Sequence, residues 1–169
     1  MPISFLPDMI FPALTDIRPE NLTARGIELL LLDFDNTIVP YTTDTPTEEM
    51  ERWLASMRRS GIRLCVVSNS RKPRVQRFCE ARGLDCITHA KKPFQRGIRA
   101  AKEKYGLAPE HMALAGDQIY TDVLGANCGG LNSILVSAIH NHNFWLRLRH
   151  IAELPMIAMG KRRIRHEKS

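Results

Sequence analysis

The chain has 169 residues, of which 44% are hydrophobic and 25% are charged, as in an average globular domain. This composition excludes disordered and fibrous proteins, and no apolar run approaches the roughly 20 residues that a membrane-spanning helix needs. The N-terminal residues lack the basic region and long apolar stretch of a secretory signal, so we do not expect secretion.

The net charge of +6 combines four blocks of alternating sign. Residues 1–70 carry −4, residues 71–104 carry +8, residues 105–139 carry −3 and residues 140–169 carry +5. Charge segregated in this way indicates separate acidic and basic surfaces. The basic blocks favour an anionic partner, and charge alone leaves both nucleic acid and an anionic membrane open.

The four cysteines form neither a Cys-x-x-Cys pair nor a His/Cys cluster with zinc-site spacing. Three of them lie in apolar or strand-like segments, where cysteine behaves as a small hydrophobic residue. We therefore expect structural thiols in a reducing, cytoplasmic compartment. A peripheral position on the inner face of the membrane is the alternative that the basic blocks suggest.

Apolar runs of strand length alternate with helical patterns along the chain. In chain order the sequence predicts a strand over 27–33, a helix from Thr45 to about Ser60, a strand over 62–68, a helix over 73–82, a short strand over 85–88, a helix over 94–105, a strand over 111–116, a helix over 122–128 and a strand over 133–136. Thr45 is predicted to cap the first helix, because Pro46 and Glu48 follow at the first and third helical positions.

This alternation implies right-handed crossovers and a mainly parallel sheet with helices on both faces. The predicted fold class is therefore α/β, a three-layer α/β/α sandwich whose core spans residues 27–139. Residues 1–26 are predicted to pack on this core or on a membrane interface. Residues 140–169 are predicted to form a basic C-terminal helix and tail.

Polar side chains follow the predicted strands where the strands end, which is where open parallel sheets gather functional groups. They are Asp33, Asp35, Ser68, Asn69, Lys91, Lys92, Asp117 and Asp122. Clustered carboxylates favour a hard cation such as Mg²⁺, while lysine, hydroxyl and N–H groups neutralise a phosphoryl group. One carboxylate can act as nucleophile and a second can act as general acid. The pattern predicts phosphoryl transfer.

Four ordered motifs resemble those of the haloacid dehalogenase (HAD) superfamily phosphatases: Asp33-Phe-Asp-Asn-Thr37, Ser68, Lys92-Pro93, and Gly116-Asp117 with Asp122. Together with Phe5-Leu-Pro-Asp8, they are similar to the subfamily IIIA-type YqeG family, which is related to mitochondrial phosphatidylglycerophosphate phosphatases. The resemblance implies a HAD-like, Rossmannoid fold. The chain departs from the family pattern at Cys128, where relatives often carry a basic residue.

The resemblance also implies a role for each matching residue. Asp33 would be the nucleophile and a Mg²⁺ ligand, and Asp35 the general acid/base and a metal ligand through its backbone carbonyl. Ser68 and the N–H of Asn69 would bind the phosphoryl group, and Lys92 would neutralise the charge of that group and of the nucleophile. Asp117 and Asp122 would be further metal ligands. Lys92 is preferred over Lys91 because it precedes Pro93, as in the family. Asp122 has a second interpretation, as the cap of the following helix.

Specificity in this superfamily usually depends on a cap domain inserted between the motifs. Asp33 and Ser68 are 35 positions apart, and Ser68 and Lys92 are 24 apart, which leaves no room for a folded cap. We therefore expect an open crevice that suits a bulky phosphate ester, with phosphatidylglycerophosphate in an anionic membrane as the leading candidate. The alternatives are a soluble metabolite, a nucleotide or a phosphoprotein, and the sequence leaves the oligomeric state open.

Two other functional classes share part of this pattern. A phospho-acceptor signalling domain also combines a strand-end aspartate with a lysine, but the second aspartate of Asp-x-Asp-x-Thr suits activation of water and a short-lived phosphoenzyme. A nucleic-acid-binding protein would use the basic block 71–104 and the basic tail. Only Phe78, Phe94 and Tyr105 could stack there, so no specific nucleic-acid partner is expected.

Overall fold

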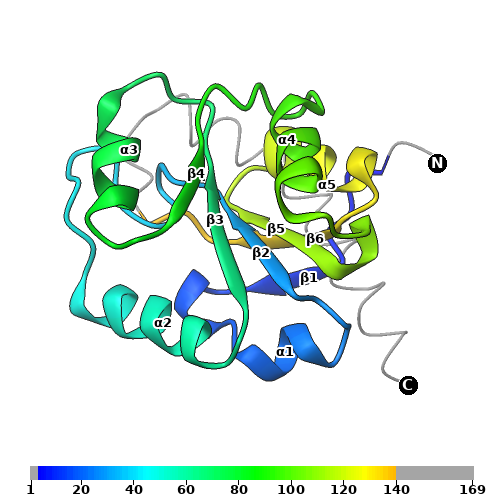
Figure 1. The fold of residues 1–169 in the computed structure, drawn as a ribbon, viewed down its shortest axis with the longest axis horizontal. Helices are drawn as coiled ribbons and strands as arrows, with labels where there is room; N and C mark the ends of the chain where they lie inside the picture. The colour runs from blue at the N-terminus through cyan, green and yellow to red at the C-terminus, as the bar shows by residue number, and fades with distance from the viewer. Residues whose placement is uncertain (1–3, 140–169) are drawn as a thin grey trace.

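A computed structural model describes residues 4–139 and places one parallel sheet at the centre of the molecule (Figure 1). Its strands are β1 (Met9–Phe11), β2 (Leu29–Leu32), β3 (Arg63–Val67), β4 (Asp85–Ile87), β5 (Met112–Gly116) and β6 (Asn132–Val136). They pair in the order β1-β6-β5-β2-β3-β4, and every pair is parallel. The predicted α/β sandwich is confirmed.

Five α-helices connect these strands: α1 (Pro19–Thr23), α2 (Glu48–Arg59), α3 (Pro73–Glu80), α4 (Arg96–Tyr105) and α5 (Leu124–Gly129). In Figure 1, α1 and α2 lie on one side of the sheet and α4 and α5 on the other. Between Asp33 and Lys92 the chain forms only α2, β3, α3, β4 and their loops, so that interval holds no folded cap.

Strand β2 shows why the sheet lies between two helical layers. All four of its leucines are fully buried. Leu30 and Leu32 belong to the core cluster that includes α2 and α3, whereas Leu29 and Leu31 belong to the cluster that includes α4 and α5. A continuous apolar run fits this position because both faces of a central parallel strand are covered.

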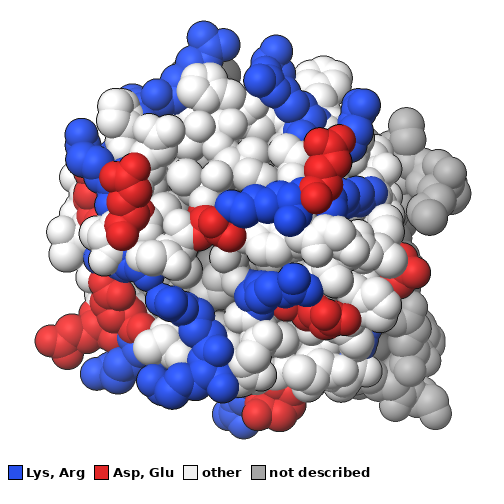
Figure 2. All heavy atoms as spheres, in the orientation of Figure 1, with Lys and Arg blue, Asp and Glu red and all other residues white. Residues whose placement is uncertain are grey.

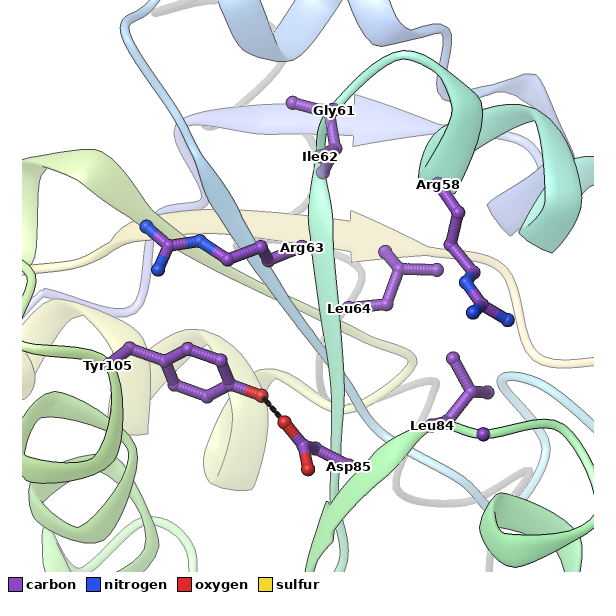
Figure 3. Close-up of a pocket in the computed structure, with 9 residues that line it drawn as sticks. Arg58, Gly61, Ile62, Arg63, Leu64, Leu84, Asp85 and Tyr105 are labelled. Carbon is purple, nitrogen blue, oxygen red and sulfur yellow. Dashed lines mark hydrogen bonds between the residues drawn. The ribbon is translucent and has the colours of Figure 1, made fainter.

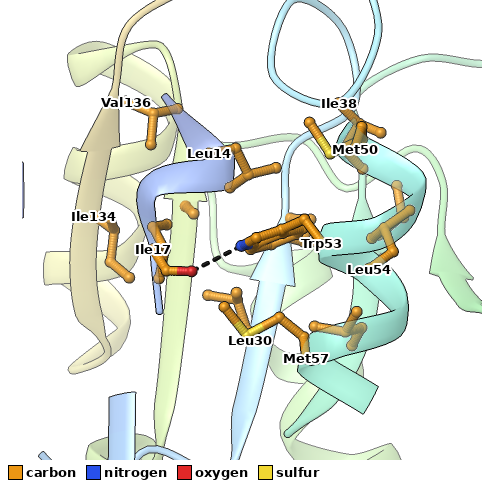
Figure 4. Packing of buried hydrophobic residues seen from close by; sticks show 14 of the residues in the cluster. Leu14, Ile17, Leu30, Ile38, Met50, Trp53, Leu54, Met57, Ile134 and Val136 are labelled. Atoms are coloured by element: carbon orange, nitrogen blue, oxygen red, sulfur yellow. Dashed lines mark hydrogen bonds between the residues drawn. The ribbon is translucent and has the colours of Figure 1, made fainter. Parts of the chain in front are cut away.

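The N-terminal segment adds an edge strand that the sequence did not predict. Strand β1 pairs with β6, and Leu14 and Ile17 pack beside α2 (Figure 4). The indole N–H of Trp53 in α2 donates to the carbonyl oxygen of Ile17 at 2.7 Å. This buried hydrogen bond ties the N-terminal segment to the helix on the same face of the sheet.

The predicted cap of α2 is wrong by two residues. The Thr47 hydroxyl accepts the N–H of Met50 at 3.2 Å, whereas the N–H of Thr45 donates to the Thr43 hydroxyl within the preceding loop. Thr47 therefore caps the helix, and Thr45 belongs to a turn of the preceding loop. The helix predicted at 94–105 starts two residues later, at Arg96. The helix predicted at 122–128 is preceded by a π-helical turn over Ile119–Val123, which continues into α5 at Leu124.

None of the helices within residues 4–139 combines the length and apolar character needed to cross a bilayer. The basic helix and tail predicted for residues 140–169 lie outside the described residues.

Candidate active site

The carboxyl edge of the sheet brings the predicted site residues together, because the parallel strands all end on that side. Asp33 follows β2 directly, and its N–H donates to the carbonyl oxygen of Ala115 in β5 at 2.9 Å. Ser68 follows β3, and Asp117 follows β5. Lys92 reaches the same edge from the loop between β4 and α4.

A buried lysine joins two of the carboxylates. The Lys92 ammonium lies 2.5 Å from Asp33 Oδ1 and 2.7 Å from Asp122 Oδ1, and only 2% of its side chain is exposed. Burial lowers the pKa of Lys92, but the Asp122 and Asp33 carboxylates together raise it above its usual value. The two carboxylates therefore favour the charged form of Lys92 at this edge. Lys91 is exposed, so the structure separates the two lysines.

The Asn69 side chain hydrogen-bonds the backbone of Lys92. Its side-chain oxygen accepts the N–H of Lys92 at 2.7 Å, and its amide group donates to the carbonyl oxygen of Lys92 at 3.0 Å. The side chain of Asn69 thus positions Lys92. That role is additional to the phosphoryl contact that the resemblance implies for its backbone N–H.

Ser68 and Thr37 supply hydroxyl groups beside the same carboxylates. Ser68 is buried, and its oxygen accepts the N–H of Ser70 at 3.0 Å. The Thr37 hydroxyl donates to Asp33 Oδ2 at 3.3 Å. Asp33 is therefore held by a cation on one oxygen and by a hydroxyl on the other. The sequence analysis assigned no role to Thr37, although its place in the Asp-x-Asp-x-Thr motif was the available signal.

Asp33, Asp117 and Asp122 form an acidic trio. One carboxylate oxygen from each lies within 4.8 Å of the others. Burial raises the pKa of Asp122 to about 6, and the Lys92 ammonium acts against this rise. A Cβ at Gly116 would lie 2.2 Å from Asp122 Oδ2, so only glycine leaves room for that carboxylate. The N–H of Gln118 donates to the same oxygen at 3.1 Å.

The acidic trio fits a divalent cation. Its oxygen donors suit Mg²⁺, which binds through a few carboxylates and otherwise keeps water or phosphate oxygens. Three carboxylates beside one ammonium also leave negative charge that a divalent ion would balance. The side chain of Asp35 is not part of this trio. Its proposed metal contact is the backbone carbonyl.

The Asp35 carboxylate faces an arginine that the sequence analysis did not single out. Arg74 in α3 lies 3.5 Å from Asp35 Oδ1. Burial raises the pKa of Asp35 above its ordinary value, while the Arg74 guanidinium acts in the opposite direction. A carboxyl with a raised pKa suits a general acid.

Two pockets flank the sheet at opposite ends. One of about 300 Å³ lies at the amino ends of β3 and β4, where the Tyr105 hydroxyl donates to Asp85 (Figure 3). Its Arg63 pairs with Glu28 outside the pocket, and the pocket lies away from the acidic trio. The other has about 340 Å³ and lies at the carboxyl edge, where Thr37, Ile38, Met50 and Ile139 line it.

The sheet topology and the carboxyl-edge site define a class of hydrolase. Residues 9–130 match the family model of the haloacid dehalogenase-like hydrolases. This match covers more than half of the chain, so the protein belongs to that family. The family predicted from the motifs is confirmed.

A particular relative narrows this assignment. A Bacillus subtilis (strain 168) protein named "Probable phosphatase YqeG" is 32% identical over 160 residues, which are 94% of this chain and 93% of that protein. This confirms the predicted grouping with YqeG.

Solved structures share the fold at lower identity. The cobalt-bound deoxy-D-mannose-octulosonate 8-phosphate phosphatase of Haemophilus influenzae is 11% identical, with a TM-score of 0.53 over 74% of this chain and 75% of that one. A Legionella pneumophila protein assigned to HAD subfamily IIIA is 12% identical, with a TM-score of 0.51 over 86% and 96% of the two chains.

We predict that Mg²⁺ stabilises the protein through the acidic trio. A ligand that binds only the folded state adds about 2.7 kcal/mol at 100 times its Kd. Thermal unfolding followed by circular dichroism should show a higher Tm with Mg²⁺ and a reversal by EDTA. Asp117→Asn should lose most of this rise, whereas the exposed control Glu103→Gln should keep it. An unchanged rise in Asp117→Asn would contradict the site.

Proposed function

We propose that this protein is a Mg²⁺-dependent phosphomonoester hydrolase in which Asp33 is the nucleophile. The observation that carries the proposal is the setting of Asp33, which touches the buried Lys92 ammonium and belongs to the acidic trio. Few structural roles need so much charge in one buried place, because each unpaired ion there is costly. The likeness to a phosphatase over nearly the whole chain supports the same reaction.

The first chemical step transfers the phosphoryl group to Asp33. One carboxylate oxygen of Asp33 attacks phosphorus, the ester bond breaks, and Asp35 donates its proton to the leaving oxygen. The Lys92 ammonium balances the negative charge of the phosphoryl oxygens. The Ser68 hydroxyl and the N–H of Asn69 donate hydrogen bonds to those oxygens.

The second step releases phosphate. Asp35, now ionised, takes a proton from a water molecule, whose oxygen attacks the phosphorus of phospho-Asp33. The bond between phosphorus and the Asp33 oxygen breaks, which restores the carboxylate and completes hydrolysis. Mg²⁺ held by Asp33, Asp117 and Asp122, with the Asp35 carbonyl, would supply further positive charge beside the phosphoryl group.

Asp33→Asn is predicted to lower phosphatase activity by at least about 10³-fold, as expected when a nucleophile is lost. The fold should remain, which far-ultraviolet circular dichroism checks. Phosphate release from 4-nitrophenyl phosphate measures activity, and acid-quenched mass spectrometry detects phospho-Asp33 in the wild type. Retained activity in Asp33→Asn would overturn the nucleophile. A long-lived phospho-Asp33 without phosphate release would instead indicate a phospho-acceptor signalling domain.

The two adjacent lysines provide a matched pair of variants. Lys92→Ala is predicted to lower kcat/KM by about 10²–10³-fold, because it removes a preorganised charge from the transition state. Lys91→Ala should change it little, since Lys91 is exposed. The measurement is steady-state hydrolysis of 4-nitrophenyl phosphate, without vesicles, by both variants under identical conditions. A larger loss in Lys91→Ala would exchange the two roles.

We further propose a bulky or lipid phosphate such as phosphatidylglycerophosphate as substrate. The absence of a cap between Asp33 and Lys92 supports an open crevice. The pocket of about 340 Å³ at the carboxyl edge is lined mainly by apolar residues, and its Thr37 contacts the nucleophile. A chain of CH₂ groups buried there would add about 0.8 kcal/mol per group. A soluble metabolite, a nucleotide or a phosphoprotein is the alternative.

Contact with an anionic membrane from the cytoplasmic side is part of this proposal. Figure 2 shows Lys and Arg side chains along the upper edge of this face as well as across its middle and lower left, and Figure 1 places the segments that lead into α3 and α4 at the upper edge. Arg71, Lys72, Lys91 and Arg96 are exposed in those segments, and Phe94 is 73% exposed. Cations around an exposed aromatic ring suit an anionic bilayer surface.

The double variant Arg71→Glu/Lys91→Glu is predicted to bind phosphatidylglycerol vesicles at least about 30-fold more weakly, at about 1 kcal/mol for each basic residue. Arg25→Glu/Arg59→Glu is the matched control, since both residues are exposed at the opposite end of the sheet. Vesicle sedimentation measures binding. Equal binding by both double variants would contradict this surface.

Phosphate release from a panel of substrates tests the substrate proposal. The panel contains phosphatidylglycerophosphate, nucleotides, sugar phosphates and phosphopeptides, each with and without anionic vesicles. The lipid should give the highest kcat/KM. A higher value for a soluble ester would replace the lipid by that class.

A further inference from the structure

Arg74 directs its guanidinium nitrogens toward the loop that follows the nucleophile motif. Nη1 donates to the carbonyl oxygen of Tyr41 at 2.9 Å, and Nη2 donates to those of Pro40 at 3.2 Å and Thr43 at 2.9 Å. Nε lies 2.7 Å from Asp44 Oδ1. Three carbonyls and one carboxylate of a single loop therefore converge on one buried side chain, which fixes the loop against α3.

The same guanidinium contacts the proposed general acid/base. Nη1 lies 3.5 Å from Asp35 Oδ1, beyond the usual 2.7–3.2 Å of an N–H···O hydrogen bond. The guanidinium carbon also lies 5.1 Å from the centre of the Phe34 ring, the residue between Asp33 and Asp35. Arg74 thus attracts the Asp35 carboxylate from a fixed position without holding it in a tight hydrogen bond.

These contacts differ in strength in a way that suits catalysis. The loop contacts are short and numerous, so they set where Arg74 lies. The contact with Asp35 is long, so Asp35 can turn toward a leaving oxygen or a water molecule at little cost. An acid/base that acts in both steps must reach two different oxygens, so a contact that keeps it near Arg74 without locking its orientation suits both proton transfers.

We propose that Arg74 is the positioning residue for Asp35 in both proton transfers, and that the loop at residues 40–44 holds Arg74 in place. The proposal rests on the phosphatase function proposed above. With Arg74 in place, the Asp35 proton passes to the leaving oxygen, and the carboxylate then takes a proton from the attacking water. Arg74 itself exchanges no proton and acts only through its contact with Asp35.

Substrates with different leaving groups provide the test. An alkyl phosphate needs a proton on its leaving oxygen, whereas 4-nitrophenyl phosphate does not, and hydrolysis of phospho-Asp33 needs Asp35 as base with either substrate. Arg74→Gln should therefore lower kcat for an alkyl phosphate by about 10²-fold, with little change in KM. With 4-nitrophenyl phosphate, stopped-flow absorbance should show a burst of nitrophenolate followed by slow turnover.

Three further variants make the result specific. Asp35→Asn should show the same pattern, and the double variant Asp35→Asn/Arg74→Gln should be no slower than Asp35→Asn alone. Arg77→Gln is the matched control, since Arg77 is exposed on the same helix, and it should behave as the wild type. Added methylguanidinium should restore part of the alkyl phosphatase activity of Arg74→Gln, which a general loss of folding would not allow.

Several outcomes would overturn the assignment. Equal losses of kcat for both substrates without a burst, or additive effects in the double variant, would show that Arg74 does not act through Asp35. If Arg74→Gln does not fold, Arg74→Lys is tested in its place, because lysine keeps the charge but lacks the forked N–H groups that bond the three loop carbonyls. A dependence on the leaving group identical to the wild type in Arg74→Lys would equally refute the proposal. A wild type that releases phosphate from no monoester would refute the phosphatase function instead.

Discussion

The ion pairs of Lys92 with Asp33 and Asp122 are the interaction on which the carboxyl edge depends. The three side chains come from three separate segments, after β2, after β4 and after β5. Each is buried, and removal of one partner from a buried pair costs about 3–5 kcal/mol because the other charge remains unpaired. The fold must therefore place these three strand ends at one edge of the sheet, and the parallel strand order β5-β2-β3-β4 does so.

Uncharged residues decide whether these charges can meet. Gly116 leaves the space in which the Asp122 carboxylate lies, and the Asn69 side chain bonds both the N–H and the carbonyl of Lys92. Neither residue needs to touch a substrate for these contacts to matter. The site thus depends on the missing Cβ of Gly116 and the side-chain amide of Asn69 as much as on its charged groups.

The topology made much of this site predictable from the sequence. Apolar runs such as Leu29–Leu32 identify central strands, and parallel strands place whatever follows them at one edge, so Asp33, Ser68 and Asp117 could be expected to meet. Arg74 could not be predicted in this way, because three of its partners are backbone carbonyls, which any residue type supplies. Strand β1 escaped prediction because three residues are too short for a periodic pattern.

The structure also changes the meaning of the basic block at residues 71–104. Lys92 and Arg74 belong to it, yet both are buried and paired with aspartates from the acidic block at residues 1–70. These two cations of the block therefore pair with acidic residues at the site and are not available to a partner. Exposed cations of the block include those in the segments that lead into α3 and α4. An anionic surface attracted there would approach the same edge at which the phosphoryl group must bind, so recognition and chemistry share one side of the sheet.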